Sequence, residues 1–387
     1  MVEEKSVNST KVFLITVVCA LICFGICMLY STSGIDWKPE GPQIDNSALK
    51  KQVTFVFIGA CVAIFLHYFD YRTLCRLSRV LMVLVGLMLL YLAIAHYFKS
   101  NFPLVRSVKG AYRWIKFGPL SIQPSEFAKI AIILFMADYY HRNNRHSGQF
   151  WKGFLKPCIP LGIMGFLIIA GGSLSVTMIT GTMVIGLLFV CGVRIRYLAL
   201  IVLMGVGLFW AVAQYSPERM RRITSFQNPE AVAQGEGYQL WNSLLALGSG
   251  GAYGQGFTES RMKLEYLPEA HNDFILSIVG EELGFMGMCV VILLYLLLLY
   301  AIFKVAANAP DYRGMIVATG LGLGLCLHGM VNIGVISGAL PTTGVTAPFI
   351  SYGGSSMLSA LISVGIVMSV ARESETAVIE DMEEETE

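Results

Sequence analysis

The chain has 387 residues, of which 55% are hydrophobic and only 14% are charged, and its mean hydropathy is +0.63. This balance excludes an ordinary water-soluble domain, which could not bury so much apolar surface. The formal net charge of +2 gives no indication of a nucleic-acid partner.

Long apolar runs recur along almost the whole sequence, and most are long enough to cross a bilayer as a helix. We therefore predict an all-α, polytopic integral membrane protein with about ten transmembrane helices. The expected helices lie at about 12–31, 53–69, 80–97, 125–140, 158–172, 174–192, 197–214, 273–303, 314–337 and 348–371. The first run has no small-residue cleavage site after it, so it is expected to be a retained helix and not a signal peptide.

An even number of helices places both termini on one side of the membrane. The loops on that side are the more densely basic, which favours cytoplasmic termini by the positive-inside rule. Two long segments, about 98–124 and 215–272, then lie outside the cell, the second as a large extracytoplasmic loop between the seventh and eighth helices.

The domain organisation expected from these runs is simple. Residues 1–11 form a cytoplasmic N-terminus, 12–371 a single transmembrane domain, and 372–387 an acidic, disordered cytoplasmic tail. Within the second outer segment, the spacing of apolar residues from Tyr238 to Gly248 predicts a short amphipathic helix. The glycine-rich stretch from Gly248 to Gly256 does not fit a nucleotide-binding loop, and we expect a flexible turn there.

Charged residues inside membrane segments are costly and usually have partners or line a wet cavity. Glu126 and Lys129 stand three residues apart at the start of the expected fourth helix, so they share a face. A structural ion pair and a substrate contact are equally open interpretations of these two residues.

The sequence HNDFILSIVGEELG opens the expected eighth helix and places Asp273 at its outer end. Asp is also a favourable residue at a helix N-terminus, which is the alternative interpretation. Glu281 and Glu282 lie deeper, where lining or pairing roles are expected.

Residues 338–356, GALPTTGVTAPFISYGGSS, combine prolines, glycines and hydroxyl groups before the last helix. Irregular backbone at membrane depth must be buried in protein or line a cavity, so this segment predicts a polar pocket. The alternative is a re-entrant turn that serves only packing.

Basic residues are also frequent in the two outer segments, and an anionic lipid head group is a reasonable ligand for them. Arg113 stands beside Trp114 in the first segment, and Arg261 and Lys263 come near the end of the second. Solvated surface charges are the alternative.

Three of these stretches together carry a family resemblance: GAYRWIKFGPLSIQPSEFAK, YLPEAHNDFILSIVGEELG and LPTTGVTAPFISYGGSS. In this order they resemble the SEDS family (shape, elongation, division and sporulation), membrane glycosyltransferases that include FtsW, RodA and SpoVE. The stretches GEGYQLWNSLLALGSGGAYGQGF, MKLEYLPEAHND and GALPTTG are more similar to the division and sporulation branch of FtsW and SpoVE than to the elongation branch.

The resemblance implies a peptidoglycan glycosyltransferase of the bacterial plasma membrane, which polymerises lipid II into β-1,4 glycan strands at the outer face during division or sporulation. The family's catalytic Asp matches Asp273, which would act as general base. Its cavity residues match Trp114, Glu126, Lys129 and the loop with Ser351, Ser355 and Ser356. Its partner-sensitive position matches Glu265.

The resemblance also implies a divalent cation, Mg or Mn, on the substrate pyrophosphate, and no organic cofactor. Expected partners are lipid II, a class B penicillin-binding protein and other division or sporulation proteins. A lipid II flippase and a non-catalytic scaffold are the alternative functions. One departure is visible, because Ser173-Leu174-Ser175 replaces an acidic-Leu-Gly-Thr sequence that many members carry.

Overall fold

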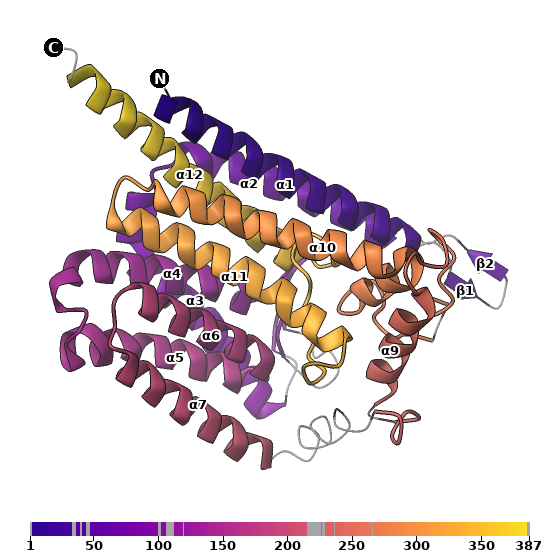
Figure 1. The fold of residues 1–387 in the computed structure, drawn as a ribbon. Helices are drawn as coiled ribbons and strands as arrows, with labels where there is room; N and C mark the ends of the chain where they lie inside the picture. The colour runs from indigo at the N-terminus through magenta and orange to yellow at the C-terminus, as the bar shows by residue number, and fades with distance from the viewer. Residues whose placement is uncertain are drawn as a thin grey trace.

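The structure is a computed structural model that describes residues 2–32, 36–38, 41–43, 47–99, 102–105, 112–118, 120–214, 226, 229–235, 237–264 and 266–384 (Figure 1). Its regular structure is almost entirely helical, as predicted. The described strands form two short antiparallel hairpins, β1 (Asp36–Lys38) with β2 (Gly41–Gln43) and β3 (Ile115–Phe117) with β4 (Leu120–Ile122).

A helix lies at each of the ten ranges expected from the sequence. These helices are α1 (Val2–Thr32), α2 (Ser47–Tyr68), α3 (Tyr71–Phe98), α4 (Pro124–Asn143), α5 (Lys156–Ala170), α6 (Leu174–Val190), α7 (Ile195–Gln214), α10 (Ile275–Ala307), α11 (Tyr312–Ile336) and α12 (Gly354–Glu384). Within the described residues, seven helical segments are long and apolar enough to span a membrane: α1, α2, α3, residues 150–170, α10, α11 and the first 24 residues of α12. The chain is therefore a multi-pass membrane protein.

Two expected boundaries need correction at the last helix. α12 begins at Gly354 and not at residue 348, because residues 348–351 form a turn that starts at Pro348 and places Phe349 at a positive φ of 67°. The expected disordered tail is also corrected, since the backbone is helical as far as Glu384. Glu375, which lies in this extension, forms an ion pair with Lys11 of α1, and this pair helps to continue the helix.

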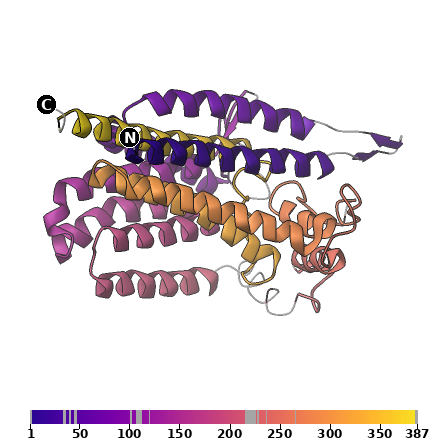
Figure 2. The same cartoon turned by 45° about the horizontal axis from the view of Figure 1, so that its top comes forward.

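The helices form one bundle, with both chain termini at the same end in both views (Figures 1 and 2). We call this end the terminal end. The β1–β2 hairpin, the start of α10 and the short helix α9 (Tyr238–Gly250) lie at the opposite end, here called the α9 end. The helix α9 confirms the short helix predicted after Tyr238.

The α2 and α12 helices pack closely because small residues face each other. A Cβ added to Gly365 would lie 2.7 Å from the backbone of Ala63, and one added to Gly59 would lie 2.5 Å from Leu361. This contact fixes the first turns of α12, and with them the irregular segment that precedes α12.

A kink divides α10, and a glycine-rich loop repairs the backbone hydrogen bonds lost there. Gly284 has φ 65° and ψ −162°, which interrupts the helical ladder. The backbone N–H groups of Gln255 and Gly256 donate to the carbonyls of Glu281 and Glu282 over 2.9 and 3.1 Å. The N–H groups of residues 285 and 286 donate in turn to the carbonyls of residues 251 and 252 over 2.9 and 3.1 Å. The glycine-rich stretch that was expected to be a flexible turn is therefore held against α10 by backbone hydrogen bonds.

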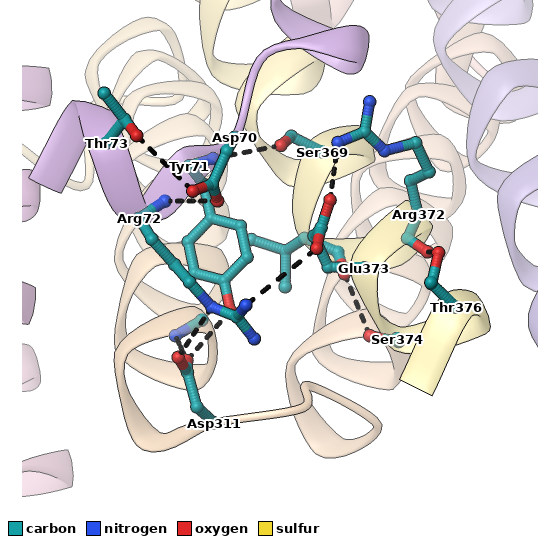
Figure 3. Close-up of polar contacts among 12 residues, drawn as sticks. Asp70, Tyr71, Arg72, Thr73, Asp311, Ser369, Arg372, Glu373, Ser374 and Thr376 are labelled. Atoms are coloured by element: carbon teal, nitrogen blue, oxygen red, sulfur yellow. Dashed lines mark hydrogen bonds and ion pairs between the residues drawn. The ribbon is translucent and has the colours of Figure 1, made fainter. Parts of the chain in front are cut away.

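At the terminal end, Asp311 ties α3 to the start of α11 (Figure 3). Its carboxylate accepts hydrogen bonds from Tyr71 Oη over 2.9 Å, from Arg72 Nε over 3.2 Å and from the Gly314 N–H over 2.6 Å. Burial acts to raise the pKa of Asp311, but the bonds from Gly314, Tyr71 and Arg72 outweigh it and leave this pKa below its ordinary value.

We expect Gly254→Ala to destabilise the fold, because Gly254 has φ +84° and an added Cβ would lie 2.1 Å from the Glu282 carbonyl oxygen. The expected loss is about 2–4 kcal/mol, seen as a lower thermal midpoint of the purified protein. Gly248→Ala is the matched control, since nothing lies within 4 Å of its Cβ position in helix α9. Equal midpoints for the two variants would contradict the repaired-kink description.

We expect Asp311→Asn to lower the thermal midpoint at neutral pH, because the NH2 group of the amide cannot accept from Arg72 and the charge that pairs with Arg72 is lost. A carboxylate with a lowered pKa contributes stability above its unfolded pKa of about 4 and loses it as pH falls through the folded-state value. The gap between wild type and variant should therefore be largest near pH 7 and close below about pH 4. Thermal unfolding measured across this pH range tests the prediction, and a pH-independent gap would contradict it.

Candidate active site

Asp273 lies in the turn that leads into α10, half-buried beside the segment 341–347. Phe274 is the N-cap residue of α10, and the first turn of this helix carries no acidic residue. Asp273 therefore lies before the helix, neither at its N-cap nor in its first turn. A Cβ added to Gly344 would lie 3.1 Å from Asp273 Oδ2, which places the carboxylate directly against this segment. The interpretation of Asp273 as a helix N-terminal residue is therefore not supported by its position.

A neutral imidazole accompanies this carboxylate. His271 stands two residues earlier, and its ring lies 5.8 Å from that of Tyr352. Burial lowers the pKa of His271, and the opposing effect of Glu269 is smaller. His271 is thus uncharged at neutral pH and contributes no positive charge beside Asp273.

Most of the irregular segment from residue 345 to residue 351 is buried in protein, whereas residues 341–344 are partly or fully exposed. Gln52 of α2 donates to the Ser351 carbonyl over 3.1 Å and accepts from the Gly353 N–H over 3.2 Å. Tyr295 of α10 donates to the Pro348 carbonyl over 2.7 Å. Side chains from two helices thus pair backbone groups that no regular structure satisfies.

The three serines expected in the site have different surroundings. Ser351 is buried, and its Oγ accepts the Ala347 N–H over 2.8 Å. Ser355 Oγ donates to the Ser121 carbonyl over 2.8 Å and accepts from the Gln123 N–H. Ser356 Oγ accepts from Thr346 Oγ1 over 2.9 Å, and Ser356 also lines a cavity. Of the three, Ser356 is the one that lies at this cavity.

Glu126 and Lys129 form a buried ion pair on α4, with Lys129 Nζ 2.8 Å from Glu126 Oε2. Lys129 Nζ also lies 2.8 Å from His328 Nε2 of α11. Since His328 Nδ1 lies 2.8 Å from the Gly324 carbonyl, Nδ1 carries the proton and Nε2 accepts from Lys129. The pattern of the sequence brought Glu126 and Lys129 together, but it did not identify His328 as their partner.

These three side chains line a cavity of about 30 Å³. Its lining includes Ser356, Ser359 and Ser363 of α12 along with apolar residues of α4, α6 and α11. A cavity of this size with several polar groups can hold one or two water molecules. The charged pair therefore lines a small cavity inside the bundle with room for water, an environment that suits charges at membrane depth.

The basic residues expected in the site have separate positions. Arg113 Nη2 donates to the Gly172 carbonyl over 2.6 Å, while Trp114 is half-buried in the same segment. Arg261 has an exposed side chain. Lys263 is partly buried, and its Nζ pairs with Glu282 Oε1 over 2.9 Å. Glu265, the expected partner-sensitive position, lies outside the described residues.

Glu281 and Glu282 hold the loop before Asp273 in place, which agrees with the expected pairing role. The Glu281 carboxylate accepts from the Arg261 N–H over 3.0 Å and from Ser260 Oγ. Glu282 accepts from Ser31 Oγ at the end of α1 over 2.6 Å and from Lys263 Nζ. Two adjacent carboxylates on α10 thus anchor both α1 and residues 260–263.

Asn332 of α11 is a site residue that the sequence analysis missed. Its Nδ2 donates to the backbone oxygens of Asp273 and Val345 over 2.7 and 2.6 Å. Like His328, Asn332 is a polar residue within an apolar, glycine-rich helix. Polar residues at membrane depth are rare, so their presence in this helix was the signal that could have found them.

The fold and this arrangement define a multi-pass membrane protein with a polar site built from α4, α11 and the segments before α10 and α12. The family described as "Cell cycle protein", which groups FtsW, RodA and SpoVE, matches residues 11–376. The chain belongs to this family.

Its relatives match along nearly their whole length. Stage V sporulation protein E of Bacillus subtilis is 37% identical over 373 residues, which cover 94% of this chain and 98% of that protein. A probable peptidoglycan glycosyltransferase FtsW of Trichlorobacter lovleyi is 35% identical over 360 residues, which cover 92% of each chain. Both relatives belong to the division and sporulation branch that the sequence resembles.

A solved structure has the same fold. This chain is similar to a chain of a peptidoglycan synthase complex that coordinates polymerization and crosslinking, with a TM-score of 0.75 and 25% identity. The match covers 93% of this chain and 97% of the solved chain. The fold is therefore shared over essentially the full length of both.

We expect Lys129→Met to destabilise the protein by about 3–5 kcal/mol, because it leaves the Glu126 carboxylate buried and unpaired. The double variant Glu126→Gln/Lys129→Met should be more stable than this single variant, since no uncompensated charge remains. Arg142→Met is the control, because Arg142 is half-exposed and Asp138 keeps its second partner Arg313 at 3.5 Å. Thermal midpoints in detergent decide the question, and a double variant less stable than Lys129→Met would contradict it.

Proposed function

We propose that this protein is a peptidoglycan glycosyltransferase, which polymerises lipid II into β-1,4 glycan strands at the outer face of the plasma membrane. The observation that carries this proposal is the position of the Asp273 carboxylate in a chain of this family. Asn332 bonds the backbone carbonyl of Asp273, and the carboxylate lies against Gly344 of the segment 341–347. The names of the FtsW relatives and the peptidoglycan synthase match support the same activity.

In this reaction Asp273 is the general base. Its carboxylate takes the proton from the 4-hydroxyl of the acceptor sugar, whose oxygen attacks the anomeric carbon of the donor. The bond from that carbon to the lipid pyrophosphate breaks, and inversion at the carbon gives the β-1,4 link. The position of Asp273 in a partly exposed turn at the α9 end suits a base that must reach a sugar.

The membrane topology proposed here has ten transmembrane helices, with the shorter or more polar α4, α6 and α7 completing the seven apolar spans. Both termini lie in the cytoplasm, and the α9 end, with its large loop between α7 and α10, lies outside. The denser basic residues of the loops on the terminal side support this orientation.

The substrate contacts proposed for this site are Arg113, Trp114, Glu126, Lys129, Arg261 and the serines of the 351–356 loop. Lys263 is also among them, although its ion pair with Glu282 must open before it can bind a phosphate. Glu265 remains a proposed partner-contact position. The chain carries Ser173 where many members have an acidic residue, so no role is proposed for that position.

The proposed cofactor is a divalent cation, Mg or Mn, that neutralises charge on the departing pyrophosphate. Among the residues that the structure describes, no group of three or more His, Cys, Asp or Glu side chains could hold a metal ion. Mg commonly binds through one or two carboxylates with substrate phosphates and waters, so a site completed by the substrate fits this chain better than a protein cage. No organic cofactor is proposed.

The proposed partner is a class B penicillin-binding protein that cross-links the product, with other division or sporulation proteins in the same assembly. A match to a chain of a complex that coordinates polymerization and crosslinking supports such a partner. The lipid II flippase and the non-catalytic scaffold remain outcomes of the test below.

We expect the purified protein with its cognate transpeptidase and Mg or Mn to make long glycan chains from lipid II. Asp273→Asn should lower the rate at least about 100-fold, because general-base catalysis contributes on that order. Glu259→Gln is the matched control, an exposed carboxylate of the neighbouring loop, and it should keep full activity.

Full activity of a folded Asp273→Asn would show that Asp273 is not the base. If wild type made no polymer while vesicles containing it moved lipid II across the bilayer, the flippase function would replace the polymerase. If the protein made no polymer and moved no lipid II but still bound the transpeptidase, the scaffold function would be supported.

A further inference from the structure

Asn332 joins two parts of the site that are far apart in the sequence. It lies near the end of α11, it is 1% exposed, and its Nδ2 donates to the carbonyl oxygens of Asp273 and Val345. Because both partners are carbonyls, the nitrogen end of the amide is fixed by its surroundings, and both of its N–H groups are used.

This amide acts on the backbone that carries the Asp273 carboxylate. Asp273 belongs to a turn before α10, and Val345 to the irregular segment before α12. A second tie stands two residues earlier, where the Tyr352 N–H donates to the His271 carbonyl over 3.0 Å. The turn that holds the carboxylate is thus attached to the segment 341–353 at two points, and one of them is Asn332.

Gly344 completes this arrangement from the opposite side. It precedes Val345, and its missing side chain leaves room for the carboxylate, since an added Cβ would lie 3.1 Å from Asp273 Oδ2 and 4.0 Å from its Cγ. The described neighbours within 4 Å of that Cβ position are these two atoms alone. The carboxylate therefore occupies a place bounded by the segment that Asn332 holds.

Three residues at or beside this contact carry a buried side-chain oxygen without a hydrogen-bond partner. Within the described residues these atoms are Asn272 Oδ1, Asn332 Oδ1 and Thr343 Oγ1, which belong to neighbours of Asp273 and Gly344 or to the amide between them. Packed cores rarely leave such atoms unpaired, whereas functional sites do so more often.

We propose that Asn332 is a positioning residue that, with Gly344, sets the place of the Asp273 carboxylate relative to the acceptor hydroxyl. This inference rests on the proposed function of Asp273 as the base. In this proposal Asn332 acts through its hydrogen bond to the backbone carbonyl of Asp273 and not as a substrate contact.

A displaced base slows proton removal while leaving the remainder of the substrate contacts in place. Misplacement by about 1 Å can lower the rate about 100-fold. Loss of the tie should therefore lower kcat and leave KM almost unchanged, whereas general damage to the fold would change both or reduce the amount of folded enzyme.

The test compares kcat and KM for lipid II in Asn332→Ala, Gly344→Ala and Asn242→Ala, each purified with the transpeptidase. Asn242 is the matched control, a buried amide of α9 whose Nδ2 donates to the Tyr266 carbonyl over 3.0 Å. We expect kcat to fall about 10- to 100-fold in Asn332→Ala and Gly344→Ala with KM within about twofold. Asn242→Ala should lose thermal stability to a similar extent and keep kcat.

The proposal is overturned if both site variants keep kcat within about threefold of Asn242→Ala, or if KM rises as much as kcat falls. If Asn332→Ala does not fold, Gly344→Ala decides alone, because it removes no hydrogen bond. Asp273→Asn in the same assay distinguishes failure of the proposed mechanism from failure of the positioning role. An active Asp273→Asn defeats the proposed mechanism itself, whereas an inactive one beside fully active site variants defeats only the positioning role.

Discussion

The pairing of irregular backbone inside a membrane is the constraint on which this structure depends. A bilayer offers no water to unpaired N–H and C=O groups, so a helix can break only where other protein groups replace its hydrogen bonds. The kink of α10 at Gly284 meets this condition through the glycine-rich loop 251–256, and the segment 341–353 meets it through Gln52, Tyr295 and Asn332. Asp273 lies against the second of these breaks, so the groups that pair irregular backbone there also build the candidate site.

The same constraint separates the charges of the molecule into two kinds. Lys263 and Glu282 pair with each other and with Ser31, and this cluster ties the C-terminal end of α1 to α10. Glu126 and Lys129 instead face a small polar cavity with His328. The first cluster holds a loop, whereas the second keeps a cation and a carboxylate beside space for water.

Contacts along the segment before α12 connect this cavity with the surroundings of Asp273. Gly344 lies against the Asp273 carboxylate, Val345 is held by Asn332, and Thr346 donates to Ser356, which lines the cavity. A change at one of the two polar sites would therefore be transmitted over a few consecutive residues. The close packing of α2 on α12 fixes the position of the helix that follows this segment.

The sequence by itself determined the membrane class, the positions of the ten helices, the short helix α9 and the pairing of Glu126 with Lys129. These features follow from the local spacing of apolar residues, from the cost of exposing apolar surface to water and from the cost of placing charge in lipid. Each of these can be judged from one segment of the chain alone. The sequence did not determine the extent of α12, the role of the glycine-rich loop, or the partners of Lys129 and Asp273. His328 and Asn332 reach the site from α11, where His328 lies 199 residues from Lys129 and Asn332 lies 59 residues from Asp273. Only the tertiary structure decided these contacts, because hydrogen bonds between distant segments depend on how the helices pack and leave no periodic signal in the chain.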